Sequence, residues 1–90
     1  MSDTTFELGE VVMTQGVKRW VEDGLDPIRH LRRHARGDWG NVSDEDARRN
    51  DEAVDKGLRI LSSYDTDHGE LWIITEAGRH ATTLLTPNEY

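Results

Sequence analysis

The stretch RHARGDWG, residues 33–40, gathers several side chains that can do chemistry. His30, His34 and Asp38 are spaced four apart, so an unbroken helix would carry all three on one face. Imidazole and carboxylate groups in that arrangement can bind a metal ion, but Gly37 is expected to end the helix before Asp38, and no further ligands are evident. We therefore predict a solvated helix face with no metal and no other cofactor.

The same stretch has a second interpretation as a turn between two helices. Asp38 is suited to bond the local backbone, and Trp39, which lies between two glycines, is suited to cover the junction of the two helices. Loops on a rigid scaffold often carry function. We predict that His34, Asp38 and Trp39 lie against the C-terminal sheet, near Tyr64 or Glu76, and form the main pocket.

An enzyme of this size could be a small metal-independent ribonuclease or a toxin-like enzyme. Such chemistry needs a general base and a general acid around a phosphate, with a cation to hold it. The candidates are His34, Arg59, Tyr64 and Glu76, with His80 as a further acid. This interpretation rests on fold-level analogy, because helices followed by a meander occur in such enzymes. Three of the candidates also have a structural explanation: Arg59 and Glu76 as solvent-facing strand ends, and Tyr64 as the residue that closes a hairpin.

Composition indicates one folded domain in 90 residues, with 34% hydrophobic residues and a net charge of −7. The absence of cysteine excludes disulfides and thiolate zinc sites and fits a reducing compartment. No apolar run approaches the roughly 20 residues of a membrane span, and the acidic start is unlike a signal peptide. We expect a cytoplasmic protein that does not interact with membranes.

Charge is unevenly distributed along the chain. Residues 18–36 hold six basic and three acidic residues, whereas residues 37–57 hold seven acidic and three basic ones. Phosphate affinity comes largely from Lys and Arg, so direct nucleic-acid binding is disfavoured and a protein partner with a basic surface is expected. The predicted binding residues are Asp38, Trp39, Asp44, Glu45, Glu52 and Asp55.

Part of this set forms an acidic ridge, a row of acidic side chains on a predicted helix that spans residues 44–56. Glu45 and Glu52 are seven apart and Asp55 follows three further on, which places them along one side of the helix. Arg48, Arg49 and Lys56 interrupt the ridge. Pairing at i, i+4 could therefore turn it into ordinary surface salt bridges.

The elements that position these residues are expected to form an α+β domain of three helices and an antiparallel sheet, in the order β-α-α-α-β-β-β. Residues 10–14 read as a strand, and Thr14 can cap a helix that stops at Gly24. Asp26 and Pro27 begin a second helix with an apolar stripe of Ile28, Leu31 and Ala35 that ends at Gly37. Ser43 caps the third helix, which has a thin stripe (Ala47, Val54 and Leu58), is closed by Gly57 and should pack at the edge.

From residue 58 the hydrophobic period changes from 3.6 to 2, which predicts an antiparallel meander of strands at residues 58–64, 71–75 and 81–85. The middle strand is apolar on both faces and is therefore expected at the centre of the sheet. The helices should cover one face. The other face could meet a partner or a second copy of the chain, as in a homodimer.

Four segments together resemble a known family: GEVVMTQGV, RHARGDWG, RRNDEAVDKGLRILSSY and LWIITEAGRHATTLLTPNEY. They are similar to a small uncharacterised bacterial family often carried on plasmids and other mobile elements. EAGRH departs from the Asp-containing turn of that family, so no role of that turn is carried over. The resemblance implies a mobile-element setting and no activity. With the acidic charge, it favours an accessory protein that acts by binding a basic host-defence or nucleic-acid-binding protein, with inhibition of that protein as the suggested consequence.

Overall fold

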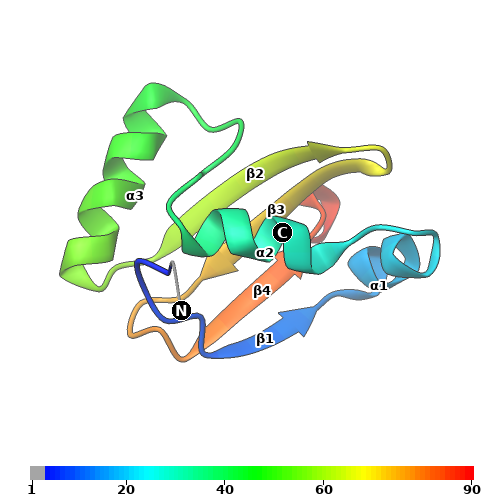
Figure 1. Ribbon diagram of the computed structural model, residues 1–90, viewed down its shortest axis with the longest axis horizontal. Helices are drawn as coiled ribbons and strands as arrows, with labels where there is room; N and C mark the ends of the chain where they lie inside the picture. The colour runs from blue at the N-terminus through cyan, green and yellow to red at the C-terminus, as the bar shows by residue number, and fades with distance from the viewer. Residues whose placement is uncertain (1–3) are drawn as a thin grey trace.

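A four-stranded mixed sheet with three helices forms the α+β fold in the computed structural model, which describes residues 4–90 (Figure 1). In chain order the elements are β1 (Glu10–Met13), α1 (Gln15–Glu22), α2 (Pro27–Ala35), α3 (Asp44–Lys56), β2 (Ile60–Thr66), β3 (Gly69–Thr75), β4 (Ala81–Leu85) and the 3-10 turn η1 (Pro87–Glu89). The predicted order of three helices and four strands is confirmed.

The strands lie side by side in the order β1-β4-β3-β2. β3 pairs antiparallel with both β2 and β4, so the C-terminal meander is confirmed and residues 71–75 lie in a central strand. β1 pairs parallel with β4, and the prediction of an all-antiparallel sheet was wrong. A parallel pair needs a long crossover, which the three helices and the two hairpins between β1 and β4 together supply.

Local capping explains where the helices begin and end. The side chains of Thr14, Asp26 and Ser43 accept hydrogen bonds from backbone N–H groups in the first turns of α1, α2 and α3, respectively. Gly57 ends α3 in the left-handed conformation, with φ of 71°, which favours glycine. All four positions were predicted from the sequence.

The helix-covered face of the sheet holds a core that includes Val17, Tyr64, Ile73 and Leu84. The predicted apolar stripe of α2 was partly wrong, because Ile28 is 54% exposed. α2 buries Ala35 as predicted, but it also buries His30 and His34, so the prediction that these histidines lie on a solvated helix face was wrong. The sheet beneath this helix carries hydroxyl groups, and a histidine can hydrogen-bond to them while an aliphatic side chain cannot.

The predicted stripe of α3 was also wrong in part. Ala47 and Val54 are half-buried against the core, but Leu58, just beyond the helix, is 53% exposed. Asn50 and Ala53 are the buried residues of this helix. Leu58 lies after Gly57, where the chain has left the helix and no longer follows its period.

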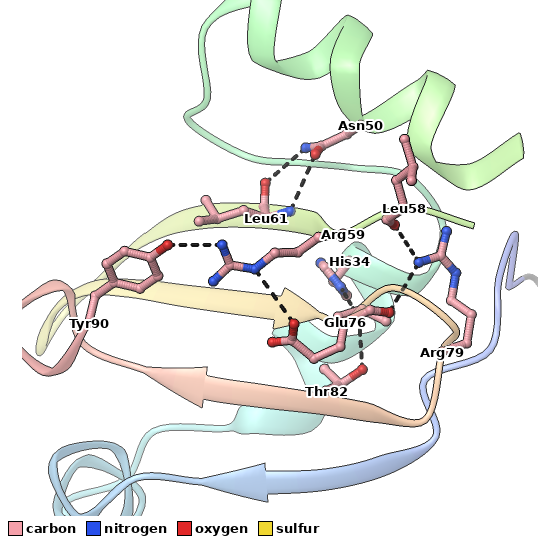
Figure 2. Close-up of polar contacts among 10 residues, drawn as sticks. His34, Asn50, Leu58, Arg59, Leu61, Glu76, Arg79, Thr82 and Tyr90 are labelled. Carbon is pink, nitrogen blue, oxygen red and sulfur yellow. Dashed lines mark hydrogen bonds and ion pairs between the residues drawn. The ribbon is translucent and has the colours of Figure 1, made fainter. Parts of the chain in front are cut away.

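The opposite face of the sheet carries the C-terminal residues rather than a helix. The Tyr90 ring packs edge-on against Trp72, with 5.4 Å between ring centroids. Ile74, which lies two residues further along β3 on the same face, is only 3% exposed. Figure 2 shows Tyr90 reaching over this face toward Arg59.

α3 packs along the outer edge of β2, as predicted, and Asn50 makes the contact. Its side-chain N–H donates to the Leu61 carbonyl at 2.8 Å, and its oxygen accepts from the Leu61 N–H at 3.3 Å (Figure 2). Ser63, two residues along, bonds to the backbone of Trp39 and Asn41. An exposed strand edge invites pairing with other chains, and these bonds occupy it.

Replacing Asn50 with alanine should therefore destabilise the protein by about 1–3 kcal/mol, because two partly buried backbone groups of Leu61 lose their partner. Arg48→Ala, on the exposed side of the same helix, is the matched control and should change stability by less than about 0.5 kcal/mol. Chemical denaturation measures both values. Equal stabilities of the two variants would contradict a role of Asn50 at this edge.

Candidate functional site

His34 is fully buried between α2 and the sheet, in a chain of polar contacts. Its Nδ1 lies 2.6 Å from the Ser62 hydroxyl and its Nε2 lies 2.8 Å from the Thr75 hydroxyl. The Thr75 and Thr82 hydroxyls are 2.7 Å apart, and the Thr82 hydroxyl donates to the Leu8 carbonyl at 2.7 Å. One imidazole thus links a helix to strands β2, β3 and β4.

The end of this chain of bonds sets the direction of every bond in it. A carbonyl only accepts, so Thr82 uses its single proton on Leu8 and must accept from Thr75. Thr75 then accepts from His34, which places the imidazole proton on Nε2. Nδ1 is left as an acceptor for the Ser62 hydroxyl. The network holds His34 as the neutral Nε2–H tautomer.

Burial, and to a smaller extent the charge of Arg79, lowers the pKa of His34 to about 3. A general base needs access to substrate, and this imidazole has no exposed surface. His34 therefore serves as a structural residue. Its replacement would disturb the fold whether or not the protein is an enzyme.

Trp39 belongs to the core as well. Its ring lies 6.0 Å from Phe6 and 5.9 Å from His34, and only 6% of the residue is exposed. Its indole N–H donates to Asp51 on α3, so the predicted cover over the α2–α3 junction is confirmed. The predicted main pocket at His34, Asp38 and Trp39 is wrong, because the His34 and Trp39 rings pack against each other in the core and are closed off from solvent.

Asp38 braces the turn, as predicted. Its carboxylate accepts from the Arg33 guanidinium at 2.7 Å and from the Gly40 N–H at 3.2 Å, and the Arg33 contact holds the pKa of Asp38 below its usual value. The Tyr64 hydroxyl donates to the Asp38 carbonyl at 2.7 Å, which confirms the predicted proximity to Tyr64. At Gly40 a Cβ atom would lie 2.0 Å from the Ser63 carbonyl oxygen, so this turn requires glycine.

The four residues considered for catalysis do not form one site. His34 and Tyr64 are buried in the helix-covered layer. Arg59 and Glu76 interact at 3.8 Å on the face that carries Tyr90, and the Arg59 guanidinium donates to the Tyr90 hydroxyl at 2.9 Å (Figure 2). No single phosphate could contact both pairs, because the sheet lies between them.

Glu89 is a structural residue that sequence reasoning missed. Its carboxylate accepts from the Thr14 hydroxyl, the Gly16 N–H and the Thr86 N–H, and thereby joins the C-terminal turn to the start of α1. These bonds, the one from Thr14 first, lower the pKa of Glu89 to about 2. The spacing of Thr86 and Glu89 is that of a capping box and could have indicated the local part of this contact.

The predicted acidic ridge on α3 is partly neutralised. The Glu45 carboxylate lies 2.8 Å from Arg49, and the Glu52 carboxylate lies 3.3 Å from Lys56. Asp46 also lies 3.7 Å from Arg49. All of these side chains are more than half exposed, so each pair contributes only tenths of a kcal/mol.

Three aspartates of α3 form no ion pair with the residues that the structure describes. Asp44, Asp51 and Asp55 recur at i, i+7 and i+11, so they lie along one side of the helix, and we refer to them as the aspartate stripe. All three are exposed. Asp51 accepts the Trp39 indole N–H, which anchors the middle of the stripe.

Within residues 4–90, no group of three or more His, Cys, Asp or Glu side chains is arranged to hold a metal ion. In the same range no helix is long and apolar enough to cross a membrane. Comparison with protein-family models, curated proteins and solved structures gives no match. The interpretation of the site therefore depends on the geometry of this chain.

Acid should destabilise the protein through His34 before it protonates the carboxylates. The pKa of His34 is about 3 in the folded protein and about 6.5 in the unfolded chain, so the unfolded chain binds the extra proton and stability falls as the pH drops below 6.5. We expect a loss of about 1 kcal/mol between pH 7 and pH 5.5, to which His30, whose pKa is also lowered, adds. Denaturation at both pH values measures it. His34→Gln should show a smaller decrease, and an unchanged decrease would contradict this assignment.

Glu89 should titrate near pH 2 in the folded protein, well below the usual pKa of 4.5. Its folded-state pKa is lowered, so its contribution to stability is present above pH 4.5 and is lost as the pH falls toward 2. Carboxyl carbon chemical shifts in NMR measure this pKa. Thr14→Val should raise it more than Thr86→Val does, because the Thr14 hydroxyl is the largest cause of the shift. The reverse order would contradict the assignment.

Proposed function

We propose that the protein acts by binding a partner protein with a basic surface, through the aspartate stripe of α3. In the mobile-element setting implied by the family resemblance, such a partner would be a host-defence or nucleic-acid-binding protein that is inhibited by occupation of its basic surface. The observation that carries the proposal is the row of three exposed carboxylates on α3, none of which forms an ion pair with the residues that the structure describes.

Charge complementarity supports this surface over the predicted ridge. Glu45 and Glu52 already have cationic partners on α3, so a basic protein would have to displace Arg49 and Lys56 to reach them. The stripe has no such competitor among the described residues. A net charge of −7 adds long-range attraction, which raises the rate of encounter with a basic partner.

The dispersal of the candidate catalytic residues favours binding over the ribonuclease alternative. His34 and Tyr64 are buried, and Arg59 and Glu76 lie across the sheet from them. A base, an acid and a cation around one phosphate would be needed for that chemistry.

The experiment compares two charge-matched double variants in a pull-down from the native host. Asp44→Asn with Asp55→Asn removes two carboxylates of the stripe and should lower capture of basic proteins at least tenfold. Glu45→Gln with Glu52→Gln removes two carboxylates of the paired side and should leave capture within about twofold of wild type. Asp51 is left unchanged because it holds Trp39.

Ionic strength provides a second readout. Capture by the wild type should decrease as salt rises from about 0.05 to 0.5 M, because screening shortens the range of attraction between exposed charges. Equal capture by the two double variants, or capture that salt does not change, would overturn the proposal.

A further inference from the structure

The outer edge of β1 is open in the part of the chain that the structure describes. β1 is the last strand in the sheet order and pairs only with β4, and Figure 1 shows it at the margin of the sheet with no further element beyond it. The opposite edge is different, because Asn50 and the turn at Trp39 and Asn41 bond to β2. Of the two sheet edges, only the one at β1 is accessible to another strand.

The pairing with β4 determines which backbone groups of β1 point outward. The Glu10 N–H donates to the His80 carbonyl at 3.0 Å, so the backbone groups of Glu10 point toward β4. Successive residues of a strand alternate in this direction. Val12 therefore also bonds toward β4, and Val11 and Met13 present their N–H and C=O groups at the open edge.

The side chains at the centre of this edge are apolar on both faces of the sheet. Val11 lies beside Thr82, which belongs to the hydrogen-bond network of His34, so Val11 is on the α2 side and Val12 is on the other. Each valine is 42% exposed. Soluble proteins usually protect an open edge with a lysine, a proline or a bulge. The two central residues of β1 provide no such protection.

Apolar surface continues on the α2 side of the sheet. A groove of about 510 Å³ lies between α2 and the segment that leads into β1, and its apolar lining includes Leu8, Ile28 and Leu31. Ile28 is 54% exposed although it belongs to the helix stripe that was expected to be buried. A chain that docks along β1 would reduce the exposure of this surface as well as that of Val11.

We propose that β1 pairs antiparallel with β1 of a second copy of this chain, with the two-fold axis between the two Val12 residues. In this register Val11 lies opposite Met13 of the second copy, and Met13 lies opposite Val11 of the second copy. The outward groups of each facing pair then exchange both of their N–H···O bonds. The pairing leaves the bonds between β1 and β4 unchanged.

Symmetry favours a second copy over a strand of another protein. The outward groups of β1 are spaced evenly on either side of Val12, so the edge is complementary to itself. The β2 edge of each copy is occupied by its own chain, so the assembly closes at two copies and does not grow into a fibre. The inference does not depend on the proposed function, because the aspartate stripe is on α3, beside β2 at the far edge.

The dimer should be weak and should respond to salt in the opposite way to the proposed partner binding. A contact centred on one short strand is at the small end of protein interfaces, where complexes are transient. Each copy carries a net charge of −7, so the two copies repel each other and salt reduces this repulsion. Sedimentation of the wild type should show a monomer at micromolar and a dimer at millimolar concentration, with more dimer as salt rises.

Charge exchange at the axis tests the register. Val12→Lys and Val12→Glu each place like charges next to each other and should each weaken the dimer at least tenfold. An equal mixture of the two variants should recover it, because opposite charges then face each other. Asp44→Asn with Asp55→Asn should leave the dimer unchanged.

Cross-linking through a single thiol gives an independent readout, because the sequence contains no cysteine. Two cysteines introduced by Val12→Cys would have Cα atoms about 4.5 Å apart, which a disulfide can span. Val11→Cys is the matched control with the same exposure, but its two copies would lie about 7–8 Å apart, which is too far. Under mild oxidation Val12→Cys should form the covalent dimer at least tenfold faster.

Thermal melting of each variant checks that its fold is intact. The inference is overturned if the wild type stays monomeric at millimolar concentration, which would leave the edge for a strand of another protein. It is also overturned if the mixture of charged variants fails to recover the dimer, or if Val11→Cys cross-links as fast as Val12→Cys. Loss of basic partners in the stripe variants bears only on the proposed function.

Discussion

A neutral histidine with both ring nitrogens bonded is the interaction on which the rest of this structure depends. His34 contacts Ser62 on β2 and Thr75 on β3, and through Thr82 the network reaches β4 and the Leu8 carbonyl. A hydrophobic residue at this position could not satisfy the buried hydroxyl groups. The network therefore specifies how α2 sits on the sheet, since a shift by one residue would leave several polar groups unpaired.

The two ends of the chain are secured by different means, and both are needed to close the fold. The segment before β1 contributes Phe6 to the cluster around Trp39, while the C-terminal turn uses Glu89 to hold the start of α1. β1 directly follows the segment that contains Phe6, and it pairs with β4, which is followed by the C-terminal turn. The parallel pair at this edge is thus supported by side-chain contacts on both sides.

The acidic side chains fall into two groups, those that hold the fold together and those that are exposed without an internal partner. Asp38 is used in a turn and Glu89 in a cap, and their pKa values are lowered by the bonds they accept. Among the described residues, Asp44 and Asp55 on α3 and Asp65 and Asp67 on the β2–β3 hairpin form no ion pair. Net charge alone does not distinguish these groups, because an acid that braces a turn and an acid that meets a partner count equally in the sum. Only the unpaired ones can contribute binding energy without first breaking an internal contact.

The sequence by itself determined the elements and their ends, because caps and breaks act locally: Thr14, Asp26 and Ser43 bond N–H groups within three residues, and the period-2 pattern predicts the meander. It also placed Asp38 correctly as a brace. The tertiary structure alone decided that β1 runs parallel to β4 and that His34 is buried, since both depend on contacts many residues away. From its position in the helix alone, His34 was predicted to be exposed to solvent. The hydroxyl groups of Ser62 and Thr75 that bind it lie on strands far along the chain.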